Sequence, residues 1–125
     1  MSDTMTYLTD ATMITAVVPA GRADDLLKAA RDVGARGGIV HQARGTGARE
    51  LLGLLGIAVE VEREVVNIVV PTDYQELVTN AIFHAGGLDK PGGGYLYLTA
   101  LEKVATYIPE ASMARLQAGE TQRLK

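Results

Sequence analysis

Cysteine is absent from the 125-residue sequence, and serine occurs only at positions 2 and 112. Thiol nucleophiles, thiolate metal sites, iron–sulfur clusters and disulfides are therefore excluded, and a serine-based catalytic triad would need a residue from a terminal segment. Apolar runs are far shorter than the ~20 residues that span a bilayer, and no basic stretch precedes an apolar one near residue 1. We expect one soluble, cytoplasmic domain.

Basic residues are also few, with 12 Lys+Arg against 15 Asp+Glu and a formal net charge of −3. They form no cluster along the chain. Because nucleic-acid affinity depends largely on cationic contacts with phosphates, this pattern argues against a nucleic-acid partner. Hydrophobic residues make up 47% of the chain, which suffices for a core without disulfides or a structural metal.

The hydrophobic pattern predicts two successive strand–helix–strand units. Strands are expected at 13–18, 39–43 and 64–70, followed by a long alternating strand at 95–107. Helices are expected at 22–33 and from about 72 to 85, where apolar residues recur at helical spacing. Thr72 and Gln75 form a candidate capping box for the second helix. The order β-α-β-β-α-β predicts an α+β, ferredoxin-like sandwich with both helices on one face of a four-stranded antiparallel sheet.

Glycines concentrate at two predicted strand ends, one after the second strand and one before the fourth. Glycine permits positive φ and lets backbone N–H groups approach an anion closely, although such loops also serve as ordinary turns. Nearby cations favour a phosphate-binding role. The candidate nucleotide-binding residues in these two loops are Arg44, Gly45, Thr46, Gly47, Arg49, Lys90, Gly92, Gly93 and Gly94.

From about residue 15 to 107 these features resemble the nitrogen-regulatory PII signalling superfamily. Arg44-Gly45-Thr46-Gly47 stands where PII proteins carry a lysine followed by Gly-Phe-Gly, and Val69-Val70-Pro71 matches the end of the family's third strand. The spacing beyond that proline places Lys90 and Gly92-Gly93-Gly94 on the family's phosphate-contacting loop. The resemblance implies a homotrimer that binds a nucleotide between subunits and has a partner-binding T-loop at residues 44–62. Around the adenosine it places Gly45, Thr46, Gly47 and Val69, and facing the phosphates it places Lys90 and Gly92 to Gly94, with Arg44 or Arg49 supplying charge.

The sequence departs from the PII pattern at several ligand-binding positions. Arg49 replaces a glutamine that helps to bind magnesium and 2-oxoglutarate, which argues against 2-oxoglutarate sensing. Tyr95, Thr106 and Ile108 replace a lysine and two arginines that hold phosphates, so ADP or AMP is expected to bind at least as tightly as ATP. The T-loop has no tyrosine for uridylylation, and its apolar run Leu51–Ile57 suits either partner docking or packing within the trimer.

The resemblance implies a non-enzymatic regulator without a cofactor, whose effector is an adenine nucleotide and whose partner is a transporter or an enzyme. Inorganic-carbon uptake or metabolism is a candidate process, with bicarbonate as a further candidate ligand. The expected organisation is a polar segment at 1–10, a PII-like domain at 11–108 and a tail at 109–125. The alternative is a metal-tolerance protein of the CutA kind or a small ferredoxin-like enzyme, for which the candidate residues are His41, Glu60, Glu62 and Glu64.

Overall fold

The computed structural model describes residues 6–45 and 61–107, and Thr46, Gly47, Arg49 and the run Leu51–Ile57 lie outside these ranges. Strands account for more of the described residues than helices do, and the helices follow β2 and β4. In chain order the elements are β1 (Thr6–Leu8), β2 (Ala11–Pro19), α1 (Ala23–Asp32), β3 (Ile39–Gly45), β4 (Val61–Pro71), the 3-10 helix η1 (Thr72–Tyr74), α3 (Gln75–Ala85), β5 (Tyr95–Leu101) and β6 (Val104–Thr106). Neither described α-helix is long and apolar enough to cross a membrane.

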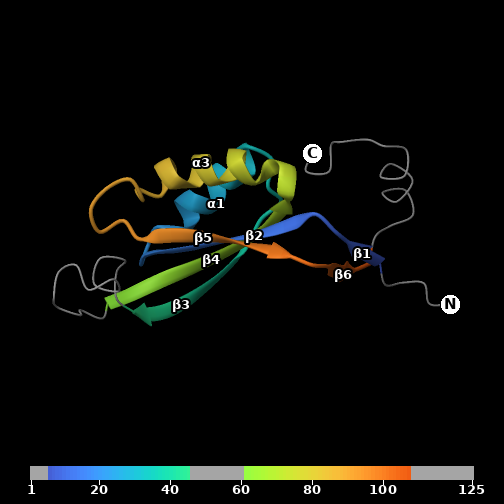
Figure 1. Ribbon diagram of the computed structural model, residues 1–125. Coiled ribbons are helices and arrows are strands. Elements are labelled where there is room, and N and C mark those ends of the chain that lie inside the picture. Colours follow the sequence, from blue (N-terminus) through green and yellow to red (C-terminus); the bar gives the residue numbers. More distant parts are fainter. Residues whose placement is uncertain (1–5, 46–60, 108–125) are drawn as a thin grey trace.

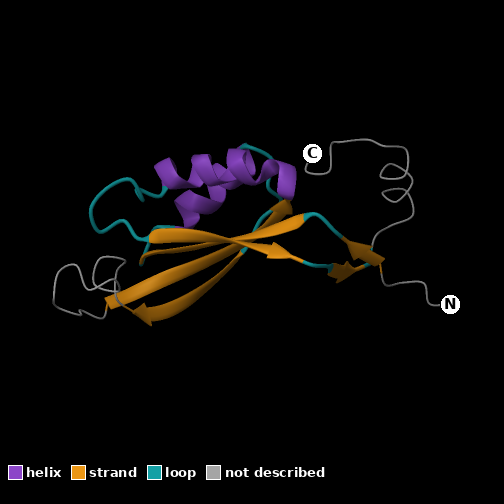
Figure 2. Ribbon diagram, in the orientation of Figure 1, coloured by secondary structure: helices purple, strands orange, loops and turns teal. Residues whose placement is uncertain are grey.

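Four antiparallel strands form the main sheet in the order β3-β4-β2-β5. Both α1 and α3 lie on the same face of this sheet, one beside the other (Figure 1). Colouring by secondary structure shows the two layers, helices above and strands below (Figure 2). This strand order and the one-sided helices confirm the predicted α+β, ferredoxin-like sandwich.

The core lies between the helices and the two central strands. Alternate side chains of a strand point to the same face, so every second residue of β2 and β4 faces the helices. Burial of each large apolar side chain stabilises the fold by about 1.5–3 kcal/mol, which makes this layer the main source of stability. The residues are Ile14, Ala16 and Val18 of β2 and Val66, Ile68 and Val70 of β4, packed against Leu26, Ala30, Val78 and Ile82.

The start of α3 differs from the predicted capping box of Thr72 and Gln75. The 3-10 turn η1 precedes α3, and neither element has a side-chain cap at its N-terminus. Thr12 of β2 donates a hydrogen bond to Gln75 Oε1 over 2.9 Å, and its hydroxyl oxygen lies 3.1 Å from that of Thr72. The capping-box prediction is wrong because the buried Thr12 needs hydrogen-bond partners, and these two side chains supply them.

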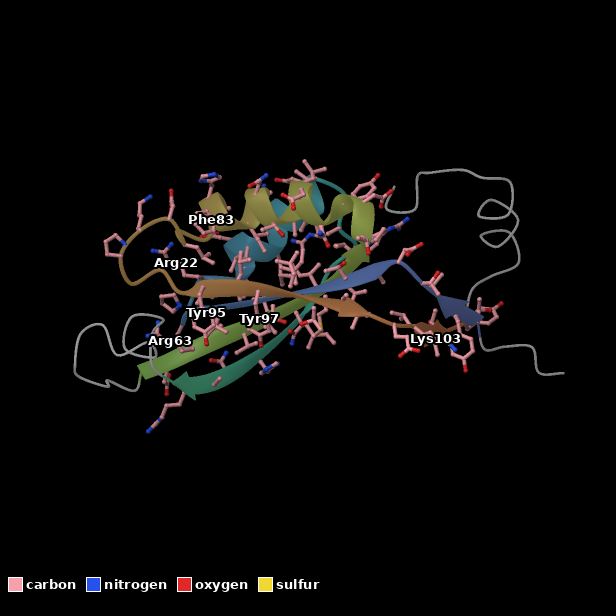
Figure 3. The ribbon with its side chains drawn as sticks, viewed as in Figure 1. Arg22, Arg63, Phe83, Tyr95, Tyr97 and Lys103 are labelled. Carbon is pink, nitrogen blue, oxygen red and sulfur yellow. The ribbon has the colours of Figure 1, made fainter. Side chains whose placement is uncertain are left out.

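The predicted long strand at 95–107 is two strands with different partners. β5 pairs with β2 and ends at Leu101, opposite Ala11. β6 pairs with β1 instead, so that Thr106 faces Thr6, and the two short strands form what we call the β1–β6 ribbon. Lys103, between β5 and β6, places its ammonium 4.8 Å from the centre of the Tyr7 ring (Figure 3). Strand character was predicted correctly at both ends of this segment, but its continuity was not.

The face of the sheet turned away from the helices, which we call the open face, carries a second set of apolar side chains. Tyr95 and Tyr97 of β5 point to this face, their rings stacked 6.4 Å apart (Figure 3). Tyr97 is 50% exposed, and Val69 of β4 is 46% exposed. No element within residues 6–45 and 61–107 covers the open face. Exposed apolar surface of this kind is typical of a protein interface.

Candidate functional site

Two of the predicted ligand-binding segments lie at the same end of the sheet, on its two edge strands β3 and β5. Arg44 and Gly45 are the last residues of β3, and they pair with the start of β4. The glycine loop, residues 88–94, leads into β5, which begins beside the end of β2. Because β2 and β4 are antiparallel, the end of β2 and the start of β4 lie at the same end of the sheet (Figure 1). The described parts of these two segments therefore share one end of the sheet.

Backbone packing explains two of the three glycines in the glycine loop. A Cβ on Gly93 would overlap the carbonyl oxygen of Gly87, and a Cβ on Gly94 would overlap that of Val17. The N–H of Gly93 donates to the carbonyl oxygen of Lys90 over 3.0 Å. Glycine is thus required at positions 93 and 94 to close the loop, whether or not a phosphate binds there.

Gly45 and Gly92 lie in open space instead. A Cβ on either would meet no atom of the described residues within 4 Å. Gly92 has a φ of 76°, which side chains with a Cβ rarely adopt, whereas Gly45 is an ordinary strand residue. Packing therefore does not explain the glycine at position 45, and an added side chain there would project into space that a ligand could occupy.

The described cations at this end of the sheet are weakly engaged. Lys90 Nζ lies 3.8 Å from Asp89 Oδ1, and its side chain is 71% exposed. Asp89 also lies 3.6 Å from Nδ1 of His84, which is in the last turn of α3. Ion pairs this exposed contribute little to stability, so Lys90 can turn towards an anion at small cost. Arg44 lines a surface cavity of about 480 Å³ with Gln42, Ala43 and Glu62.

Val69, the predicted adenosine contact, lies at the other end of the sheet. Strands rise about 3.3 Å per residue, which places Val69 about 23 Å along β4 from Glu62. There Val69 lines an apolar cavity of about 120 Å³ beneath the β1–β6 ribbon, together with Leu8, Val70, Pro71 and Val104. A single copy of the chain therefore does not bring Val69 to the glycine loop.

The replaced phosphate-binding positions are also divided between the two ends. Tyr95 begins β5 directly after the glycine loop, and its ring points to the open face (Figure 3). Thr106 lies in β6, in the β1–β6 ribbon. Ile108 is outside the described residues.

Two arginines near the glycine-loop end were missed by sequence reasoning. Arg63 of β4 is 8% exposed and faces the open face, and its buried Nε has no hydrogen-bond partner among the described residues. Arg22 occupies the N-cap of α1, and its guanidinium donates to the carbonyl oxygen of Gly86 over 3.3 Å. A cation at a helix N-terminus opposes the helix dipole, which is the sequence signal that Arg22 has a partner elsewhere in the fold.

Glu64 joins the sheet to the start of α1. Its Oε1 accepts hydrogen bonds from the backbone N–H groups of Gly21 and Ala23, each over 2.9 Å, and its Oε2 accepts one from Gln42 over 3.4 Å. The hydrogen bond from the N–H of Ala23 is the main cause that holds the pKa of Glu64 below its ordinary value. Desolvation opposes this shift, and hydrogen bonds from Gln42 and from the backbone of Gly21 and Arg22 lower the pKa further by smaller amounts. Glu64 therefore acts as a tertiary cap for α1.

We expect Glu64→Gln to lower the stability of the protein at pH 7 by up to about 1 kcal/mol, because the charge at the helix N-terminus is lost. Since folding lowers the pKa of Glu64, its charge stabilises the native state above the unfolded-state pKa. That contribution disappears as the pH falls through the lower native pKa. Urea unfolding between pH 7 and pH 3 should show the two proteins converging in acid. Glu62→Gln, an exposed change on the same strand, is the control, and a pH-independent difference for Glu64→Gln would contradict the assignment.

The alternative metal site is not assembled by the described residues. Strand alternation places Glu62 and Glu64 on the helix side of the sheet, whereas His41, paired with Val65, lies on the open face. Glu60 is outside the described residues. Within residues 6–45 and 61–107, no group of three or more histidine or acidic side chains could hold a metal ion. The structure therefore gives this reading no support.

Comparisons with known proteins identify the fold. No protein-family model matches the chain, and no curated protein sequence matches it. Among solved structures, the crystal structure of Arabidopsis thaliana PII bound to citrate is similar, with a TM-score of 0.60 and 23% sequence identity. The match covers 75% of this chain and 79% of the Arabidopsis chain. The chain has a PII-like fold, which confirms at the level of fold the resemblance inferred from its motifs.

Proposed function

We propose that this protein is a non-enzymatic PII-like signalling protein that binds an adenine nucleotide between the subunits of a homotrimer. The observation that carries the proposal is the division of the predicted site. Arg44, Gly45 and the glycine loop lie at one end of the sheet, and Val69 lies at the other. One copy cannot offer both ends to a single nucleotide, but two neighbouring copies can, each contributing one end.

The open face supports assembly of several copies. Ile39 is 69% exposed on β3, and with Tyr97 and Val69 it gives this face large apolar side chains on three strands. An antiparallel sheet with helices on one side is expected to have polar residues on the other side when that side faces water. A second and third copy would cover this apolar surface.

The proposed ligand carries few phosphates. Each charge-assisted contact with a phosphate contributes on the order of 1.5–3 kcal/mol, so the number of cations limits how much phosphate charge can be neutralised. Of the cations that the resemblance assigns to the site, Arg44 and Lys90 are described, and Tyr95 directly follows the glycine loop where the resemblance places a lysine. ADP and AMP are therefore the favoured effectors.

The proposed output is the T-loop, residues 44–62, whose two ends are the paired strands β3 and β4. A nucleotide at Arg44 and Gly45 would contact the base of this loop directly. The proposed partner is a transporter or an enzyme. Inorganic-carbon uptake or metabolism is the process suggested by the resemblance, with bicarbonate as a second ligand to test.

Calorimetric titration of the full chain tests the proposal. ADP, AMP and ATP are added with and without bicarbonate, and divalent metals and 2-oxoglutarate are titrated separately. We expect ADP or AMP to bind at least as tightly as ATP. ATP with magnesium binding about tenfold more tightly than ADP, a difference of about 1.4 kcal/mol, would contradict the argument from missing cations. Binding of a divalent metal without any nucleotide would instead favour the metal-tolerance alternative.

A further inference from the structure

Arg22 connects the start of α1 to the region that carries the glycine loop (Figure 3). Its Nη1 donates to the carbonyl oxygen of Gly86, the C-cap residue of α3. The guanidinium also lies against Gly87, where a Cβ would meet Nη1 at 2.8 Å. Gly87 has a φ of 74°, so glycine is required there both for the backbone conformation and to leave room for Arg22.

The glycine loop is built on Gly87. The carbonyl oxygen of Gly87 accepts a hydrogen bond from the N–H of Lys90 over 3.1 Å. Gly93 packs so closely on the same carbonyl that a Cβ would overlap it, and the N–H of Gly93 donates to Lys90. The position of Gly87 therefore determines where both Lys90 and Gly93 lie, and Arg22 is a side chain that fixes Gly87.

Glu64 holds the backbone on both sides of Arg22. Glu64 accepts hydrogen bonds from Gly21 and Ala23, the residues on either side of Arg22. No carboxylate within the described residues forms a salt bridge with Arg22, whose guanidinium donates instead to the neutral carbonyl of Gly86. Arg22 therefore positions the backbone of Gly86 and Gly87, although its positive charge is unfavourable at the N-terminus of α1.

We propose that Arg22 is a positioning residue that sets the glycine loop for the phosphates of the bound nucleotide. This inference rests on the proposed function, because it assumes that the loop contacts phosphate. The proposal predicts that loss of Arg22 weakens binding of ADP and AMP, which carry phosphates, and leaves binding of adenosine unchanged. A general loss of folding would weaken all three ligands together.

Arg22→Met and the control Lys28→Met test, in the full chain without ligand, whether Arg22 positions the glycine loop. Lys28 is also on α1, its side chain is 73% exposed, and its described ion pair is with Asp32, so the control removes the same charge from the same helix. Amide hydrogen exchange is measured at Lys90 and Gly93. We expect exchange about fivefold faster or more in Arg22→Met, the factor that corresponds to one lost hydrogen bond, and no change in Lys28→Met.

Calorimetry with ADP, AMP and adenosine tests whether the position of the glycine loop affects phosphate binding. Arg22→Met should bind ADP and AMP about fivefold more weakly than the parent and adenosine within about twofold, while Lys28→Met binds all three normally. Arg22→Lys keeps the charge and one donor for Gly86 but loses the planar contact with Gly87, so it should fall between the parent and Arg22→Met in both measurements. It also serves as the test variant if Arg22→Met does not fold.

Each contrary result has a separate meaning. Unchanged exchange at Lys90 and Gly93 would overturn the proposal even if ADP bound more weakly, because Arg22 would then act only through its charge. Faster exchange with unchanged ADP affinity would overturn the link between the loop and the phosphates. If the parent protein bound no nucleotide, the proposed function and the phosphate role of Arg22 would both fail, and the exchange measurement would still decide whether Arg22 positions the loop.

Discussion

Tyr97→Glu is expected to convert the proposed homotrimer into a monomer. Tyr97 lies on the open face and is 50% exposed in the single chain, so the change does not disturb the core. In the proposed trimer this face is covered, and the new carboxylate would be buried without a partner. Burial of an unpaired charge costs several kcal/mol, and symmetry repeats that cost in every copy. Light scattering at micromolar concentration measures the mass directly.

Leu77→Glu is the matched control for this experiment. Leu77 is also 50% exposed, but it lies on α3, on the helix side of the molecule. This variant should remain a trimer. A trimeric Tyr97→Glu protein would show that the subunits associate through another surface. A monomeric parent protein would remove the proposed homotrimer altogether.

Gly45→Val should reduce ADP affinity by about 100-fold or more and leave the stability of the protein unchanged. A Cβ at this position meets no atom within 4 Å in the described part of the chain, and valine is favoured in strands, so we expect the free protein to tolerate the change. A nucleotide that lies against the backbone of Gly45 would collide with the new side chain. Affinity by calorimetry and stability by thermal unfolding are measured on the same sample.

Two further valine variants serve as controls. Ala100→Val makes a similar change at an exposed position of β5, near the other end of the sheet from Gly45, and should bind ADP normally. Gly38→Val should destabilise the fold instead, because a Cβ there would lie 2.7 Å from the carbonyl oxygen of Asn67. Normal ADP affinity in Gly45→Val would mean that the nucleotide does not approach β3, and the Arg44–Gly47 motif would lose its assigned role.

Elements defined by local patterns were predictable from the sequence. The runs of β2 and β4 alternate so that Ile14 and Ile68 face the helices, and α1 shows apolar residues at helical spacing. The pairing partner of a strand is not encoded in its own alternation. For this reason the chain between Leu101 and Val104 was read as a continuous strand, although the two sides of this interval pair with β2 and β1 respectively.

The candidate site was predicted more by resemblance than by chemistry. The motifs placed Arg44 and the glycine loop in one site; both adjoin the same end of the sheet, and their role in binding stays a prediction. They could not separate glycines needed for packing from glycines that leave space for a ligand. Gly93 packs against Gly87, which is close in the sequence. Gly94 packs against Val17, which is far away in the sequence, and only the three-dimensional structure reveals this contact. The bond between Arg22 and Gly86 escaped prediction for the same reason.

The β1–β6 ribbon also determines how the domain responds to mechanical force. The ribbon is antiparallel, and Thr6 faces Thr106 at the outer end of both strands. A pull on these two residues in opposite directions loads the hydrogen bonds of the ribbon one after another rather than all at once. A two-stranded unit of this length is only marginally stable by itself, so it yields before β2 and β5 are strained. Tension on the chain is thus released at the ribbon, at the opposite end of the sheet from the glycine loop.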